Sequence, residues 1–482
     1  MDLVRFIYND FMYINVKQGI RQRLGIFLGP LLFIIILLNR PESMSFAAAV
    51  VAGVTIWMAV WWISESIPIS ATALLPIVLF PAFGAMKVGD VTAQYGHHIV
   101  FLMLGGFFIA IAMEKWNLHK RIALFVVHII GIGPRRIIAG FMVATAFLSA
   151  WISNTSTAMV MMPIGTAVIA NISTKNSDKN FNVALMLSIA YAASIGGMAT
   201  LVGTPPNLIF AGIYQSMFGV QVNFFEWAYF GFPLAAVMLF ITWFYLTHIC
   251  YRIQKDEIPG SGEVIRAEMA GQGKMTREEK HVLLVFGLVA VSWMTRGLLW
   301  GEYLPQVSDA SIAITGALLL FLIPARQEPS LLSWEDTAKV PWGVAILMGG
   351  GFAIARGFAQ TGLAEWVSQS FDFMVVLPVF LLILGTVAIT KIFTEITSNT
   401  ATATILMPIA ASVAVSLGLS PFGIMAAVAI SSSLAFMMPV ATPPNAIVFG
   451  SGYVTIPQMA RAGLWLNLIT IVIVSMFAYF MF

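Results

Sequence analysis

Residues 153–164 of the chain read SNTSTAMVMMPI, and the pattern returns 245 positions later as SNTATATILMPI at residues 398–409. The same offset relates Gly105-Gly106-Phe107 to Gly350-Gly351-Phe352. After each copy a Thr-Pro-Pro-Asn sequence follows, at 204–207 and at 442–445. The offset is then 238, because a polar loop around 175–182 is shorter in the second copy. Matches that keep one offset over this length indicate an internal repeat.

The composition indicates that the chain lies in a lipid bilayer. Hydrophobic residues make up 59% of its 482 residues and charged residues only 10%, whereas soluble domains carry about 25% charged residues. Mean hydropathy is +0.89. A net charge of +3 and a single cysteine, Cys250, exclude a nucleic-acid-binding protein and a disulfide scaffold. The predicted class is an all-α polytopic membrane protein.

Stretches apolar and long enough to cross a bilayer, which needs about 20 residues, occur eleven times. They lie near 24–39, 46–64, 70–86, 98–113, 183–212, 228–251, 281–300, 309–325, 341–357, 421–450 and 460–482. Two further stretches, 137–171 and 373–418, are each interrupted by a Ser-Asn-Thr triplet. We predict that each of these forms a re-entrant hairpin, which enters and leaves the membrane on one side.

The distribution of basic residues supports this topology. With the amino terminus in the cytoplasm, eleven crossings place most of the 25 Lys and Arg residues on the cytoplasmic side, as the positive-inside rule requires. Counting either hairpin as a crossing would reverse every later loop. The chain crosses an odd number of times between equivalent positions, so the two copies are predicted to be inverted, as in many secondary transporters.

The polar interruptions predict the position of a binding site. Inside lipid a helix breaks only where protein, water or a ligand satisfies the freed backbone groups. A Pro-Pro pair disfavours helix before it and favours helix after it, so Thr204 and Thr442 are predicted to lie in unwound turns. Because Ser, Thr and Asn are good N-caps, both Ser-Asn-Thr triplets are predicted to open the second arm of their hairpin.

Four half-helix N-termini would then converge on one cavity. Each carries roughly +0.5 charge, and together they match a dicarboxylate, which carries two negative charges. The opposing half-helix C-termini offer carbonyl and hydroxyl oxygens among which Na⁺ can bind.

Other interpretations are weaker. A single Ser-Asn-Thr triplet would indicate helix packing, but two triplets at one offset, each followed by a Pro-Pro break, indicate a site. Lys391 and Glu395, four residues apart, are expected to pair with each other. An enzyme is not favoured, because the sequence has neither an HExxH motif nor a convincing acid pair in facing spans.

At these motifs, together with WWISESIP at 61–68 and the order of the spans, the chain resembles the divalent anion/sodium symporter family over nearly its whole length. The resemblance implies a carrier of succinate, malate, fumarate and related acids, built as a homodimer with an elevator mechanism. It implies one sodium site at Ser149, Ser153, Asn154 and Gly203, and another at Thr394, Thr397, Asn399 and Ala441. It places substrate on Ser153, Asn154, Thr155, Thr204, Pro205, Ser398, Asn399, Thr400, Thr442 and Pro443.

The expected domain organisation follows from the resemblance. A scaffold (dimerisation) part comprises residues 1–135 and 281–372, and a transport part comprises 136–251 and 373–482. Residues 252–280 form a cytoplasmic linker, which we predict to be a solvated connection at the inner membrane surface.

The predicted function is Na⁺-coupled import of C4-dicarboxylates across a bacterial cytoplasmic membrane, with Na⁺ as the coupling ion and no nucleic-acid partner. The alternative is a sodium-independent dicarboxylate/2-oxoglutarate exchanger of the same family. An anion channel is less favoured.

Overall fold

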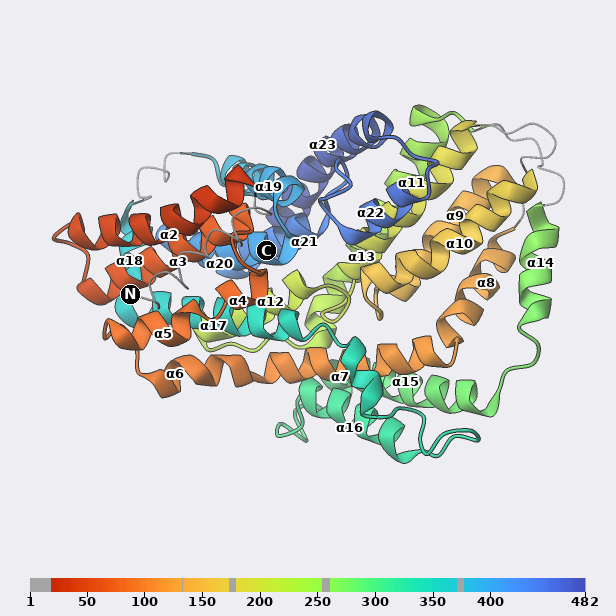
Figure 1. Cartoon of the computed structure of the whole chain (residues 1–482), viewed down its shortest axis with the longest axis horizontal. Coiled ribbons are helices and arrows are strands. Elements are labelled where there is room, and N and C mark those ends of the chain that lie inside the picture. Colours follow the sequence, from red (N-terminus) through yellow and green to blue (C-terminus); the bar gives the residue numbers. More distant parts are fainter. Residues whose placement is uncertain (1–18, 132, 173–178, 254–260, 371–376, 482) are drawn as a thin grey trace, which may run out of the picture.

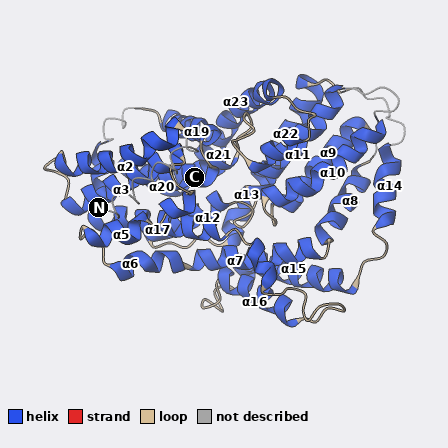
Figure 2. Cartoon of the chain, viewed as in Figure 1, coloured by secondary structure: helices blue, strands red, loops and turns tan. Residues whose placement is uncertain are grey.

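All regular structure in the described part of the chain is helical, as Figure 2 shows. The computed structural model describes residues 19–131, 133–172, 179–253, 261–370 and 377–481. The predicted all-α class is confirmed. Ten helices within these ranges are long and apolar enough to cross a membrane. The predicted eleven crossings and the re-entrance of the two hairpins stay predictions.

The ten helices extend over most of the chain. They are α2 (Ile20–Leu38), α3 (Phe46–Ser64), α6 continuing into α7 (Val88–Lys115), α11 (Lys179–Gly197), α13 with a π-helical end (Phe224–Cys250), α15 with a π-helical end (Arg277–Trp300), α17 (Trp342–Thr361), α19 (Val379–Ile396), α20 (Asn399–Ser416) and α23 (Ile456–Met481). Three shorter apolar segments are Ile69–Ala82, α16 (Asp309–Leu322) and α21 (Pro421–Ser433).

The internal repeat is visible as a series of paired helices. In the first copy, α7 (His98–Lys115), α8 (Leu118–Ile130), α9 (Pro134–Ser149) and α10 (Asn154–Ile172) correspond to α17, α18 (Leu363–Ser370), α19 and α20 in the second. After the loop, α11 and α12 (Pro205–Phe218) correspond to α21 and α22 (Pro443–Gly450). The sequence prediction missed α8 and α18, which are short and apolar on one face only.

Two of the predicted spans, 183–212 and 421–450, are not continuous helices. The first divides into α11 and α12, and the second into α21 and α22. Thr204 and Thr442, which precede the Pro-Pro pairs, have extended backbone with φ of −147° and −139°, because proline disfavours the helical conformation in the residue before it. The predicted breaks, and the half-helices that begin at Pro205 and Pro443, are confirmed.

Two further segments differ from expectation. The predicted span 70–86 divides into α4 (Ile69–Thr72) and α5 (Leu75–Ala82), where Pro76 in the first turn of α5 cannot donate a helical hydrogen bond to α4. The linker, predicted to be a solvated connection, contains a helix, α14 (Ser261–Gly271), which packs against α8 and α10. In Figure 1, α14 lies at the end of the molecule opposite α2.

A smaller apolar core joins the amino-terminal helices to the second copy. α17 packs against α3, α4 and α5, and the buried side chains include Phe33, Trp62, Phe80 and Phe358. A larger core covers most of the remaining helices.

The two copies interlock through their half-helices. α12 of the first copy packs against α20 and α21 of the second, and α22 packs against α10 and α11 of the first. This exchange brings both Pro-Pro breaks and both hairpin tips to the region between the two ends of the molecule (Figure 1).

Candidate functional site

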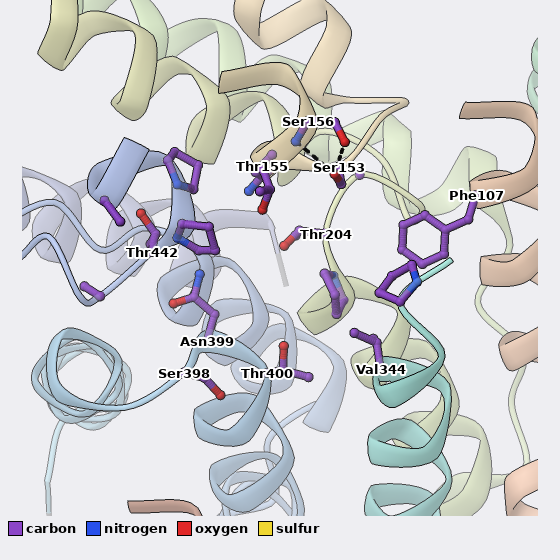
Figure 3. Close-up of a pocket in the computed structure, with 18 of the residues that line it drawn as sticks. Phe107, Ser153, Thr155, Ser156, Thr204, Val344, Ser398, Asn399, Thr400 and Thr442 are labelled. Carbon is purple, nitrogen blue, oxygen red and sulfur yellow. Dashed lines mark hydrogen bonds between the residues drawn. The ribbon is translucent and has the colours of Figure 1, made fainter. Parts of the chain in front are cut away.

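A cavity of about 880 Å³ lies where the hairpin tips and the Pro-Pro breaks meet. In Figure 3, Ser153 and Thr155 face Asn399 and Thr400 across it, and Thr204 lies between them. The family resemblance implied ten substrate-binding residues, and all ten line this cavity. They are Ser153, Asn154, Thr155, Thr204, Pro205, Ser398, Asn399, Thr400, Thr442 and Pro443. The structure therefore brings together residues from four separate segments, and their role in binding stays a prediction.

Each hairpin tip begins a helix whose first turn faces the cavity. Ser398 Oγ accepts a hydrogen bond from Ala401 N at 3.2 Å, and Ser153 Oγ accepts one from Ser156 N at 3.1 Å. These are N-capping contacts, and the helix ends that they cap carry partial positive charge. The prediction that both triplets open the second arm of their hairpin is confirmed.

Ser156, which stands where the second copy has Ala401, joins the same cap. Its hydroxyl accepts a hydrogen bond from Ser153 Oγ at 3.0 Å, drawn as a dashed line in Figure 3. The additional hydroxyl therefore leaves the capping geometry of the first tip like that of the second.

Matching asparagines, Asn207 and Asn445, fix the two breaks. Asn207 Nδ2 donates to two carbonyl oxygens of the first break, at 3.1 and 2.7 Å. Asn445 Nδ2 donates to two carbonyl oxygens of the second break, each at 3.1 Å. Both side chains are fully buried. Because these carbonyls lack helical partners, the side-chain amides satisfy them and keep both breaks in one conformation.

Behind the first hairpin tip, three oxygen atoms share a single hydroxyl proton. Ser149 Oγ, in the last turn of α9, lies 2.6 Å from Asn154 Oδ1 and 2.6 Å from Ala193 O. A hydroxyl has one proton and donates to one acceptor at a time, so one of the two short contacts has no proton between its oxygens. Ser149 is fully buried. A small hard cation, which takes oxygen ligands, fits this donor set.

The second copy repeats this arrangement. Thr394 Oγ1, near the end of α19, lies 2.7 Å from Asn399 Oδ1 and 2.5 Å from Ser432 O. Thr394 is also fully buried. Both hydroxyls lie at the C-terminal end of a hairpin arm, where the helix dipole favours positive charge.

The other residues implied for sodium lie between these clusters and the cavity. Those that line the cavity are Ser153, Asn154, Gly203, Thr397, Asn399 and Ala441. A Cβ at position 203 would lie 2.4 Å from Gly197 O, so this part of the first break admits only glycine. The Thr397 hydroxyl contacts Thr402 Oγ1 at 2.6 Å and donates to Phe393 O at 2.9 Å.

The sequence prediction missed one apolar wall and the charged rim of the cavity. Phe107 and Val344 flank the cavity on the side away from Thr442 (Figure 3). Phe107 belongs to the repeated Gly-Gly-Phe motif, which is the signal that could have identified it. The charged lining residues are exposed or half-buried and come from four separate elements, namely Arg21, Glu65, Glu114 and Lys339. No local pattern connects these four.

The expected pairing of Lys391 with Glu395 is wrong. Lys391 Nζ forms no hydrogen bond with any described residue and lies 4.7 Å from the centre of the Phe436 ring. Glu395 instead accepts hydrogen bonds from main-chain N–H groups of the second break and from Asn467. The (i, i+4) spacing indicated proximity, but tertiary contacts determine the partners.

Two copies of a broken-helix hairpin around a central cavity, in a helical membrane protein, are the architecture of many secondary transporters. Residues 25–481 match the family described as the sodium:sulfate symporter transmembrane region. The chain belongs to this family, which confirms the divalent anion/sodium symporter resemblance.

Its relatives include named carriers. The chain is 42% identical over 481 residues to the sodium-dependent dicarboxylate transporter SdcS of Staphylococcus saprophyticus, covering 97% of this chain and 92% of that protein. It is 43% identical over 474 residues to SdcS of Staphylococcus aureus strain USA300, covering 95% and 91%.

Two solved structures share the fold. One is the YdaH transporter of Alcanivorax borkumensis, with a TM-score of 0.61 and 15% identity over 89% of this chain and 98% of that one. The other is MtrF of Neisseria gonorrhoeae, with a TM-score of 0.58 and 13% identity over 92% and 97%. At these identities the similarity concerns the fold alone.

Proposed function

We propose that this protein imports C4-dicarboxylates such as succinate, malate and fumarate across a bacterial cytoplasmic membrane, coupled to Na⁺. The observation that carries the proposal is the cavity, which ten uncharged residues of two hairpin tips and two breaks line, with a matched oxygen cluster behind each tip. The names of the relatives SdcS, as sodium-dependent dicarboxylate transporters, support it.

Neutral groups bind the two carboxylates of the substrate. Four helices, α10, α12, α20 and α22, begin at the cavity, and each N-terminus offers roughly +0.5 charge. The first residues of α10 and α20 also offer N–H groups, whereas α12 and α22 each begin with two prolines, which have none. Four charged residues line the cavity, and the two basic ones, Arg21 and Lys339, lie on its exposed rim.

Asn154 and Asn399 connect the cations to the substrate. The Oδ1 atom of each accepts a hydrogen bond from the hydroxyl of the oxygen cluster behind its hairpin tip, while its Nδ2 atom has no hydrogen-bond partner among the described residues. A bound Na⁺ supplies positive charge beside the tip. By taking Oδ1 as a ligand it fixes the amide, so that Nδ2 is available to a substrate carboxylate.

In the proposed topology, the cavity opens toward the cytoplasm. The rim residues Arg21, Glu65, Glu114 and Lys339 lie at helix ends that this topology assigns to the cytoplasmic side, together with the amino terminus. We infer that the transport part, 136–251 and 373–482, moves as an elevator against a scaffold of 1–135 and 281–372, and that the scaffold forms the homodimer.

Succinate uptake into proteoliposomes tests the proposal. An inward Na⁺ gradient should accelerate uptake over an equal K⁺ gradient, and equal rates would refute sodium coupling. Counterflow into vesicles preloaded with 2-oxoglutarate, in sodium-free buffer, would instead identify the exchanger. Single-channel currents in a planar bilayer would identify a channel.

A further inference from the structure

Glu395 is a buried carboxylate for which the proposed function has no role. It follows Thr394 near the end of α19 and is 8% exposed. Its oxygens accept hydrogen bonds from Phe436 N at 2.8 Å, from Met437 N at 3.1 Å and from Asn467 Nδ2 at 2.6 Å. Phe436 and Met437 lie in the second break, so this carboxylate connects the first arm of the second hairpin to the break.

Lys391 contacts the same part of the break from one turn earlier on α19. It is 2% exposed, and its Nζ atom, which has no hydrogen-bond partner, lies 4.7 Å from the centre of the Phe436 ring, an arrangement typical of a cation–π contact. On the opposite side, Tyr191 Oη donates to Phe436 O at 2.9 Å. Phe436 is therefore fixed through its N–H, its ring and its carbonyl.

The first copy has no such charges. The offset of 245 places Ala146 and Ala150 at the positions of Lys391 and Glu395. There the break is anchored by neutral groups, since Thr200 Oγ1 donates to Ala150 O at 2.5 Å and Trp227 Nε1 donates to a break carbonyl at 2.9 Å. Burying a carboxylate and an amine costs desolvation energy that neutral anchors avoid. The charges are specific to the second break.

The second break ends at the candidate cation site. Ala441, which precedes Thr442 at the end of the break, lines the cavity, as Asn399 does, and is one of the residues implied for sodium. Asn445 Nδ2 donates to Ala435 O and Met438 O, on either side of Phe436 and Met437. Asn445 therefore satisfies carbonyls of this segment, while Glu395 satisfies its N–H groups, and both fix the segment that leads to Ala441.

We propose that Glu395 is a positioning residue that sets the second break for Na⁺ binding at the site of Thr394, Asn399 and Ala441. The proposal rests on the proposed function and deepens it. Removing the acceptor oxygen releases two main-chain N–H groups, and the Ala441 carbonyl then loses its place in the site.

Two substitutions of similar length separate positioning from packing. Glu395→Met removes every acceptor, whereas Glu395→Gln keeps one oxygen for the N–H groups of the break. We expect Glu395→Met to raise the Na⁺ concentration for half-maximal succinate uptake about tenfold, since hydrogen bonds to a charged group are lost. Glu395→Gln should stay within about threefold of the wild type. Melting temperatures of the purified variants establish that each one folds.

Further variants complete the experiment. Lys391→Met combined with Glu395→Gln removes both formal charges and keeps the acceptor, so its Na⁺ requirement should match that of Glu395→Gln. The exposed Glu365→Gln on α18 is the control for loss of a carboxylate and should leave uptake unchanged.

The outcomes are distinct. A Na⁺ requirement that is unchanged in Glu395→Met, or raised equally in Glu395→Gln, would overturn the positioning role. A lower melting temperature alone, with the Na⁺ requirement unchanged, would also overturn it, because packing accounts for that result. If uptake by the wild type itself does not respond to Na⁺, the proposed function fails, whatever the variants do.

Discussion

Asn154 Oδ1 lies 2.6 Å from Ser149 Oγ, across the interruption of the first hairpin, and the structure gives Asn154 Nδ2 no hydrogen-bond partner among the described residues. Asn399 stands in the same relation to Thr394, at 2.7 Å. In the proposed mechanism, each asparagine therefore offers its oxygen to the cation and its nitrogen to the substrate. Coupling between ion and substrate can arise from this geometry without any charged residue.

Replacing Asn154 or Asn399 by alanine should impair transport more than folding. The side chain removed offers Oδ1 to the cation and Nδ2 to the substrate, so uptake at fixed substrate and Na⁺ should fall at least about tenfold. The melting temperature should change little, because the only side-chain hydrogen bond that the structure gives either amide is the one from Ser149 or Thr394. Variants that aggregate would show that the asparagines serve helix packing.

The hydroxyl at position 394 should determine the Na⁺ requirement. Thr394→Val keeps the shape and removes the oxygen, and we expect the Na⁺ concentration for half-maximal uptake to rise about tenfold. Thr394→Ser, which retains the hydroxyl, should stay near the wild type.

The matched control is Thr390→Val, one turn earlier on the same helix. Thr390 is also fully buried, but its hydroxyl donates to Thr386 O at 2.8 Å and is part of no oxygen cluster. Equal effects of the two valine substitutions on the Na⁺ requirement would contradict a cation at Thr394.

Local patterns predicted the breaks and the hairpin tips because backbone chemistry determines them. Pro205 and Pro443 cannot donate hydrogen bonds and restrict the residue before them, and Ser153 and Ser398 can cap the helix that follows. The repeat then indicated that these elements act together. These signals depend on residue types along the chain and not on which residues lie close together in space.

The parts that the sequence prediction missed depend on tertiary contacts. Glu395 and Lys391 are four residues apart on one helix, yet both contact Phe436, some forty positions later, rather than each other. The rim residues Arg21 and Lys339 lie 318 positions apart along the chain. Spacing along a helix predicts which side chains share a face, but not which segment of another element packs against it.

The doubly ionised form of the substrate should be the one transported. The four half-helix N-termini together carry about two positive charges, so a monoanion compensates only half of that charge. Between about pH 5 and pH 7, where succinate loses its second proton, uptake should follow the concentration of the dianion. Fumarate, a stronger diacid, is the control, and its uptake should vary much less over this range. Succinate uptake that follows total concentration would contradict recognition of both charges.

Asp336, which anchors the loop leading to Lys339 and Val344 at the cavity, should make stability depend on pH. It accepts hydrogen bonds from Lys115 Nζ at 2.7 Å and from Ser333 N at 2.9 Å. Burial alone would raise the pKa of Asp336, but these hydrogen bonds outweigh it and lower the pKa below its ordinary value.

The folded state keeps Asp336 ionised at lower pH than the unfolded state does. The contribution of Asp336 to the free energy of unfolding is therefore present above its ordinary pKa, and it is lost as the pH falls through the lowered pKa of the folded state. Asp336→Asn should therefore reduce the free energy of unfolding by about 1 to 2 kcal/mol near neutral pH, and this difference should narrow below about pH 4. Thermal unfolding of the purified protein across pH measures it. The neighbouring exposed Glu335→Gln is the control and should behave like the wild type throughout. A difference that stays constant down to the lowest pH would show that the contribution of Asp336 does not depend on its charge.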